Sequence, residues 1–282
     1  MAIEHISDTA RWVAIYRAME TDRPDAIFRD PFARRLAGAK GEDIVRTLPR
    51  AQQMAWPMIV RTAVFDELIM SRIHSGVDCV LNLAAGLDAR PWRLDLPKQT
   101  QWIDADLPGI LQYKVDQLRN EPLKCRYEPV MIDLRDVARR RALFLQVASR
   151  SQRVLVVTEG LLIYLEPTEV TELGRDLHAQ PNFRWWLIDI ASPRLLKMMQ
   201  KMWGFAASQG NAPFKFAPAE STAFFQPTGW REAEFRPMGE EARRLNRMMR
   251  GAWFFTLLAK FSTKRMREQM KRFSGITLLE RS

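Results

Sequence analysis

The chain has 282 residues, of which 47% are hydrophobic and 10% aromatic, and it carries a formal net charge of +10. This length corresponds to one large domain or two small ones, and the apolar content excludes global disorder because it can form a sizeable core. Two cysteines exclude a disulfide-rich scaffold, and no group of residues has metal-ligand spacing.

The N-terminal stretch, residues 1–21, is polar and charged, which is not the pattern of a secretory signal. The longest apolar runs, such as residues 253–259, are far shorter than the roughly 20 residues that cross a bilayer. We therefore expect a globular protein of the cytoplasm.

Two helical patterns occur within the first 75 residues. Residues 1–35 have apolar side chains at helical spacing until Asp30-Pro31 interrupts them. A second helix is predicted over residues 54–74, and Gly76 is expected to end it.

From residue 78 the pattern changes to short apolar strands that alternate with helices. We predict strands over residues 79–83, 101–106, 127–132, 153–159 and 184–190, with helices over 107–120, 136–149 and 167–179. This alternation is typical of βαβ units and a parallel sheet, in which ligands bind outside the carboxyl ends of the strands.

After residue 190 the periodicity is looser. Pro, Met and aromatic residues over 191–225 indicate a cap or lid, followed by a turn at 228–230, a strand at 233–238, a helix at 240–250 and a last strand at 275–280.

Each strand of the predicted parallel sheet ends in a polar or small residue. These residues are Gly86, Asp104, Asp106, Asp133, Glu159 and Asp189. Small residues around Gly86 allow a ligand to approach the backbone, although a purely structural turn explains them equally well. The acids at 104 and 106 follow about 20 residues later, where the hydroxyls of an adenosine ribose would need a carboxylate.

Asp133 and Arg61 each have two interpretations. Asp133 could bind the adenine amino group or cap the following helix. Arg61 could hold a ligand carboxylate or pair at the surface with Asp66 or Glu67. The chain lacks a phosphate-binding glycine-rich loop, which argues against nucleotides and dinucleotides and favours S-adenosylmethionine, whose cationic sulfonium suits nearby acids.

Short motifs occur in order over about residues 5–190. They are Ser7-Asp8-Thr9-Ala10, Phe28-Arg29-Asp30-Pro31-Phe32-Ala33, Arg61-Thr62-Ala63-Val64-Phe65-Asp66, Asn82-Leu83-Ala84-Ala85-Gly86-Leu87-Asp88-Ala89-Arg90, Trp102-Ile103-Asp104-Ala105-Asp106-Leu107-Pro108, Ile132-Asp133-Leu134-Arg135 and Thr158-Glu159-Gly160-Leu161-Leu162-Ile163-Tyr164-Leu165. Together they resemble the leucine carboxyl methyltransferase superfamily, and most closely its bacterial branch of S-adenosylmethionine-dependent O-methyltransferases. Beyond residue 190 only Thr228-Gly229-Trp230 fits.

The resemblance implies an α/β, Rossmann-like methyltransferase fold, with a mostly parallel seven-stranded sheet, an antiparallel last strand and a helical N-terminal cap. We expect a single domain over residues 1–282. Within it, 1–75 form the cap, 76–190 the cofactor-binding core, and 191–282 the lid, the last strands and a basic segment.

The resemblance also implies which residues bind S-adenosyl-L-methionine. They are Arg61 at the cofactor carboxylate, Ala84 and Gly86 at the amino-acid moiety, Asp104 and Asp106 at the ribose, Asp133 and Leu134 at the adenine, and Glu159 near the amino group and the reaction centre. Ala84 replaces a glycine of the eukaryotic members, which weakens the transfer of protein-carboxyl methylation to this chain but not that of cofactor binding.

Glu159 and Tyr164 are the implied catalytic residues, with Tyr164 facing a small-molecule methyl acceptor. An ionised carboxylate acceptor needs no base, whereas a hydroxyl acceptor does. Among the three histidines, His74 and His178 fall on predicted helices with structural roles. His5 lies in the segment that would cover the pocket and could contact substrate.

The charge excess lies at the C-terminus. Residues 1–240 have a net charge of +2, whereas 243–272 contain ten basic residues and one acid. That segment could pack on the sheet, lie on an anionic membrane, or contact nucleic acid. The near-neutral charge of residues 1–240 disfavours an RNA methyltransferase. A separate alternative to the enzyme is a catalytically silent fold relative that binds a ligand or a membrane through the basic segment. The sequence does not determine the oligomeric state.

Overall fold

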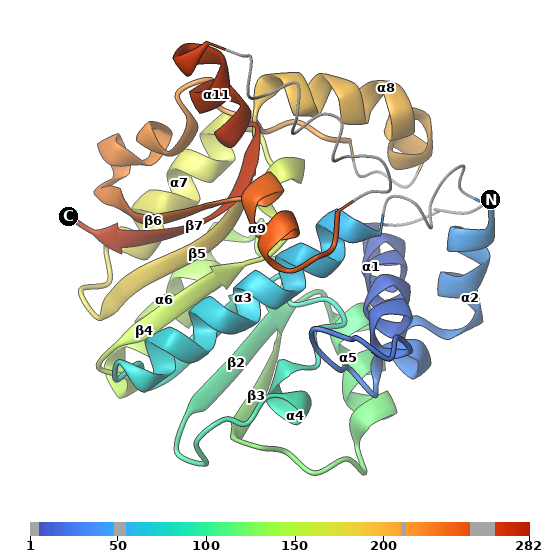
Figure 1. The fold of residues 1–282 in the computed structure, drawn as a ribbon. Coiled ribbons are helices and arrows are strands. Elements are labelled where there is room, and N and C mark those ends of the chain that lie inside the picture. Colours follow the sequence, from blue (N-terminus) through green and yellow to red (C-terminus); the bar gives the residue numbers. More distant parts are fainter. Residues whose placement is uncertain (1–5, 48–54, 210–212, 249–262) are drawn as a thin grey trace.

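The computed structural model of the chain describes residues 6–47, 55–209, 213–248 and 263–282 (Figure 1). The helices are α1 Ile6–Thr21, α2 Ala33–Thr47, α3 Trp56–His74, α4 Arg90–Arg93, α5 Pro108–Leu118, α6 Val137–Arg150, α7 Pro167–His178, α8 Pro193–Gln209, α9 Met238–Arg244 and α11 Lys264–Lys271. The strands are β1 Cys79–Leu83, β2 Gln101–Asp106, β3 Arg126–Met131, β4 Val154–Thr158, β5 Phe183–Ala191, β6 Trp230–Pro237 and β7 Ser274–Arg281. Two 3₁₀ turns, η2 Leu162–Tyr164 and η3 Ser221–Thr228, complete the described elements.

One seven-stranded sheet organises the chain, in the order β3-β2-β1-β4-β5-β7-β6. The five strands from β3 to β5 run parallel, and β7 is antiparallel to both of its neighbours. Because β1 and β4 lie in the middle with neighbours running to either side, the strand order reverses between them. An open α/β sheet binds its ligands at that point, beyond the carboxyl ends. The expected fold class is confirmed.

Helices cover both faces of the sheet, as the uninterrupted apolar strands require. Along β1, Leu81 and Leu83 point to a core shared with α6 and α7, while Val80 points to a core shared with α3 and α9. Figure 1 shows α3 and α9 in front of the sheet and α6 and α7 behind it. A third cluster joins α1, α2 and α5 through residues such as Tyr16 and Leu36. This cluster forms the helical cap beside β2 and β3.

Most predicted elements are confirmed to within a residue or two, but the first helical prediction is wrong in part. The helix predicted over 1–35 ends at Thr21, and α2 was not predicted at all. Gly38 and Gly41 weaken its helical signal, yet a Cβ on Gly41 would come within 2.8 Å of the Ala37 side chain and 3.0 Å of the Arg11 carbonyl. The glycine is needed for close packing between helices, which local propensity does not register.

The C-terminal predictions differ more. The strand expected at 233–238 begins at Trp230, and the helix expected at 240–250 ends at Arg244, with residues 249–250 outside the described part of the chain. Residues 249–262 of the basic segment predicted over 243–272 also lie outside it. None of the helices in the described ranges combines the length and hydrophobicity needed to cross a bilayer.

Candidate functional site

A cavity of about 1210 Å³ lies at the carboxyl ends of β1, β2, β4 and β5 and is also lined by α1, α3 and α8. This volume exceeds the roughly 300–1,000 Å³ of most small-molecule pockets, so it can hold two molecules. Its polar lining includes Arg61, Gly86, Asp106, Asp133, Glu159 and Asp189. Its apolar lining includes Leu195, Met199, Phe214, Phe216 and Phe273.

The turn after β1 exposes backbone to this cavity. Ala84 and Gly86 both have positive φ angles, 53° and 50°, and a Cβ on Gly86 would come within 3.2 Å of the Ala10 side chain on α1. Helix α1 therefore closes over the turn. Ala84 occupies the left-handed region that a non-glycine residue rarely adopts, which costs roughly 1–2 kcal/mol.

Asp106, the last residue of β2, supports the same turn. Its Oδ2 accepts a hydrogen bond from the Gly86 amide at 2.6 Å and its Oδ1 accepts one from the Leu107 amide at 2.7 Å. Burial raises the pKa of Asp106, although both backbone donors oppose the shift. Each carboxylate oxygen has a second lone-pair site, so Asp106 can still accept hydrogen bonds from ligand hydroxyls.

Asp104 is not part of the cavity lining, contrary to its predicted place beside Asp106 at the ribose. Its carboxylate is fully buried and accepts hydrogen bonds from Lys114 Nζ at 2.7 Å, Trp102 Nε1 at 2.8 Å and Asn82 Nδ2 at 3.0 Å. Residues i and i+2 share a strand face, but Asp104 lies roughly 6–7 Å further back along β2. Its carboxylate therefore contacts Lys114 of α5 and does not reach the open edge of the sheet.

Arg61 projects from α3 into the cavity and is not a surface residue. Its Nε donates to Glu159 Oε1 at 3.0 Å and its Nη1 donates to Asp189 Oδ2 at 3.1 Å. Burial alone would lower the pKa of Arg61, but Asp189 and Glu159 raise it above its ordinary value. The alternative pairing with Asp66 or Glu67 is wrong, because Asp66 pairs with Arg90 and Arg93 and Glu67 pairs with Arg244.

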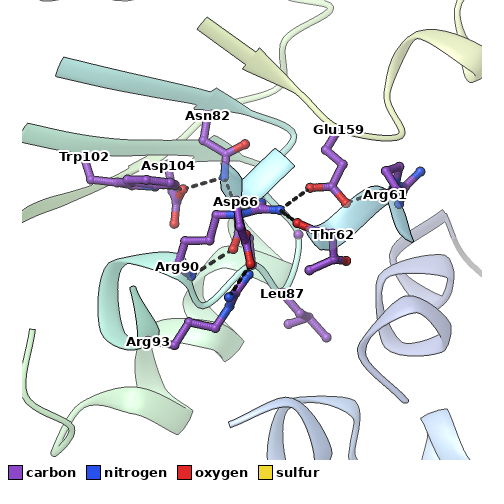
Figure 2. Close-up of polar contacts among 12 residues, drawn as sticks. Arg61, Thr62, Asp66, Asn82, Leu87, Arg90, Arg93, Trp102, Asp104 and Glu159 are labelled. Atoms are coloured by element: carbon purple, nitrogen blue, oxygen red, sulfur yellow. Dashed lines mark hydrogen bonds and ion pairs between the residues drawn. The ribbon is translucent and has the colours of Figure 1, made fainter. Parts of the chain in front are cut away.

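Arg90 connects the turn after β1 to Glu159 (Figure 2). Its guanidinium reaches Asp66 and Asp88, both at 2.6 Å, and Glu159 Oε2 at 2.9 Å. Burial alone would raise the pKa of Asp88, but Arg90 and Arg93 lower it to about 2. Because Arg61 binds Oε1 and Arg90 binds Oε2, guanidinium groups hold both oxygens of Glu159.

Asp133 and Leu134 line the cavity beyond β3. Asp133 accepts hydrogen bonds from the backbone amide and guanidinium of Arg135, and this contact lowers the pKa of Asp133. The alternative role of Asp133 as a helix cap is wrong, because Asp136 caps α6 by accepting from the Arg139 amide.

Tyr164 lies in η2 and lines the cavity, with its ring 5.7 Å from that of Phe214. Burial raises the pKa of Tyr164, and a side-chain hydrogen bond with Thr9 of α1 opposes the shift. His178 packs against Trp230 and, like His74, is not in the cavity lining. His5 lies outside the described residues.

The structure thus brings eight of the nine predicted residues into one cavity wall and leaves only Asp104 behind it. Sequence reasoning did not include Arg90, Asp66 or Asp189 among the predicted site residues. Asp189 lies near the carboxyl end of β5, as the other acids lie near the ends of their strands, so the signal was present. Arg90 and Asp66, in contrast, meet only because α3 packs across the turn.

Comparisons with known proteins show the family of this chain and proteins that share its fold. A family model described as leucine carboxyl methyltransferase matches residues 10–178. A protein of Mycolicibacterium gilvum (strain PYR-GCK) named "Putative S-adenosyl-L-methionine-dependent methyltransferase" is 36% identical over 183 residues, which cover 57% of this chain and 58% of the relative. A similarly named protein of Rhodococcus jostii (strain RHA1) is 37% identical over 142 residues, or 48% of each chain. The matched part of the chain thus spans about half to three fifths of these relatives.

Solved structures share the fold at low sequence identity. A DUF574 family protein from Streptomyces avermitilis has a TM-score of 0.60 at 11% identity and covers 95% of this chain and 97% of that one. A crystal structure from Thermobifida fusca, described as that of a putative methyltransferase, has a TM-score of 0.58 at 13% identity and covers 100% and 96% of the two chains. Since the family model spans more than half of its residues, the chain belongs to the leucine carboxyl methyltransferase family.

Proposed function

We propose that the protein is an S-adenosyl-L-methionine-dependent O-methyltransferase that acts on a small molecule. The observation that carries the proposal is the position of Asp106 at the open end of β2, where its carboxylate supports the Gly86 turn and lines the cavity. A ribose-binding acid in this position, next to a turn without a phosphate loop, suits an adenosine ligand that carries no phosphate. Family membership and the names of the relatives support the same cofactor.

The polar lining fits the chemical groups of this cofactor. We assign the ribose to Asp106, the adenine to Asp133 and Leu134, and the amino-acid moiety to Ala84 and Gly86. Arg61 would hold the cofactor carboxylate with the part of its guanidinium not used by Glu159 and Asp189, and these two acids would receive the ammonium group.

When bound, the cofactor supplies a methyl group on a sulfonium, which a nucleophilic oxygen displaces in one step. The contribution of the protein is then alignment of the acceptor and exclusion of water. Helix α1 would exclude water because it lies over the Gly86 turn. Thr9 of the same helix forms a side-chain hydrogen bond with Tyr164 and so helps to align it.

A carboxylate acceptor suits the cavity better than a hydroxyl acceptor. A hydroxyl needs a base to take its proton. Both oxygens of Glu159 are engaged by Arg61 and Arg90, and the raised pKa of Tyr164 keeps its hydroxyl protonated near neutral pH. We therefore propose that Tyr164 orients an acceptor that is already ionised.

Titration calorimetry with S-adenosylhomocysteine tests cofactor binding, and we expect saturable binding at one site. Absence of binding at millimolar concentration would refute the proposal. Arg61→Lys should weaken binding about 10-fold or more because an ammonium cannot span Glu159 and Asp189 while holding a carboxylate. Arg46→Lys, at a side chain that is 77% exposed, is the matched control and should leave binding unchanged.

Incubation of a metabolite extract with methyl-labelled cofactor identifies the acceptor class. A methyl ester releases labelled methanol on mild alkaline treatment, whereas a methyl ether does not. Release of label supports the carboxylate acceptor, and retention of label on the product points to a hydroxyl.

A further inference from the structure

Two helices beside the cavity expose methionines to solvent. In the described part of the chain, four of the six exposed large hydrophobic side chains are methionines of α8 and α11. Met198 and Met202 on α8 are 42% and 46% exposed, and Met266 and Met270 on α11 are 53% and 50% exposed. Each pair is four residues apart, so each lies on one face of its helix. We call these four side chains the methionine rim.

The rim is continuous with the apolar part of the cavity. Met198 and Met270 also belong to the cavity lining, next to Leu195, Met199 and Phe273. Figure 1 shows α8 and α11 along the same edge of the molecule, at the top of the view. A ligand that enters past the rim therefore passes from one apolar surface to another.

Basic residues accompany the rim. Helix α8 contains Arg194, Lys197 and Lys201, all exposed, and has no acidic residue. The sequence of α11, KRMREQMK, contains four basic residues and one acid. Exposed apolar side chains on helices rich in basic residues suit the headgroup region of an anionic bilayer, where the apolar groups insert and the cations stay at the phosphates.

We propose that the methionine rim docks the protein on the surface of a membrane rich in anionic phospholipids. Methionine suits this role because its flexible, polarizable side chain adapts to an irregular apolar environment. The positive charge selects an anionic lipid surface over a neutral one. Docking would set the cavity mouth against the lipid, and, if the proposed function holds, the acceptor is an amphiphile whose apolar tail lies against the methionines.

Vesicle co-sedimentation of the full chain tests the docking. We expect binding to vesicles of equal parts phosphatidylcholine and phosphatidylglycerol, weakening with added salt, and little binding to phosphatidylcholine alone. The double variant Met202→Ser with Met266→Ser should bind the anionic vesicles about 10-fold less tightly or worse, because each substitution removes an inserted apolar side chain. Lys197→Glu with Lys201→Glu should reduce the binding comparably.

The matched control replaces the other two exposed large hydrophobic residues, Leu123→Ser and Leu145→Ser, which are 45% and 61% exposed. This control should leave vesicle binding unchanged. Equal binding to both kinds of vesicle, or an equal loss in the leucine control, would overturn the proposal. So would light scattering that shows a dimer in the wild type and a monomer in the methionine variant, since the rim would then be covered by a second copy.

Cofactor binding is an independent readout, because Met202 and Met266 are not in the cavity lining. The methionine variant should bind S-adenosylhomocysteine as the wild type does, which also verifies that it is folded. If the wild type binds vesicles but not S-adenosylhomocysteine, the proposed function fails while the docking stands.

Discussion

Asp104 and Asp106 should respond to the same substitution in opposite ways. The two acids are two residues apart on β2, yet only Asp106 lines the cavity, while Asp104 is fully buried against Lys114. Asp106→Asn therefore tests ligand binding, and Asp104→Asn tests the stability of the fold. Since both variants keep the shape of the side chain, each is the control for the other.

Asp106→Asn replaces a charged acceptor by a neutral amide that offers one oxygen. A hydrogen bond to a charged group contributes about 1.5–3 kcal/mol, so losing one to a ribose hydroxyl weakens cofactor binding about 10- to 100-fold. The loss in free energy of unfolding should be smaller, about 1 kcal/mol. The side-chain NH₂ of the asparagine would face one of the two backbone N–H donors and lose that hydrogen bond, but the uncharged side chain avoids the cost of burying a charge, which raises the pKa of Asp106.

Asp104→Asn leaves the Lys114 ammonium, which is 0% exposed, without its counter-charge. Removing one partner of a buried ion pair destabilises a protein by about 3–5 kcal/mol. We expect a large fall in the urea midpoint and, for the fraction that remains folded, an affinity for S-adenosylhomocysteine close to that of the wild type.

Urea denaturation and titration calorimetry on both variants provide the two measurements. The reasoning is refuted if folded Asp106→Asn binds S-adenosylhomocysteine as tightly as the wild type. It is also refuted if Asp104→Asn loses affinity about 10-fold while its stability is unchanged, because Asp104 would then contact the ligand.

Three further predictions address stability. The pKa of Asp88 is about 2 in the fold against an ordinary value of 3.8, so at pH values above 3.8 its ionised form should stabilise the protein by roughly 2 kcal/mol. This contribution should be lost as the pH falls toward 2. The urea midpoint of Asp88→Asn should lack this decrease with falling pH, and parallel pH profiles of the variant and the wild type would contradict the prediction. Glu20 and Arg247 form a buried ion pair at 2.8 Å that joins α1 to the chain after α9. Arg247→Met should therefore lower the free energy of unfolding in urea by about 3–5 kcal/mol, and adding Glu20→Met should recover part of this loss. Strictly additive costs of the two substitutions would refute the coupling. Ala84→Gly should stabilise the protein by about 0.5–1 kcal/mol, because it relieves a φ of 53° at some cost in chain entropy, and a lowered melting temperature would contradict this.

The parallel strands and their polar ends could be predicted because both signals are local. Strands covered on two faces, such as Cys79–Leu83 and Val154–Thr158, are continuous apolar runs, and the residue that follows each one must lie at the edge of the sheet. The same reasoning located Asp106 and Glu159. It could not detect α2, because Gly41 is present for contact with α1, a partner distant from its own helical turn.

The amino-acid sequence alone therefore determined the order of the elements, the identity of the sheet edge and the family motifs, since these depend on residues within one strand or turn. Only the tertiary structure decided which acids lie in the cavity and which partners they have. Asp104 and Asp106 have the same local pattern, but Lys114 of α5 reaches only the first. Arg61, Arg90 and Glu159 come together because α3, which carries Arg61, packs across β1 and β4, although Glu159 is 98 residues from Arg61 in the chain. Ion pairing depends on distance in space, which spacing along a sequence does not specify.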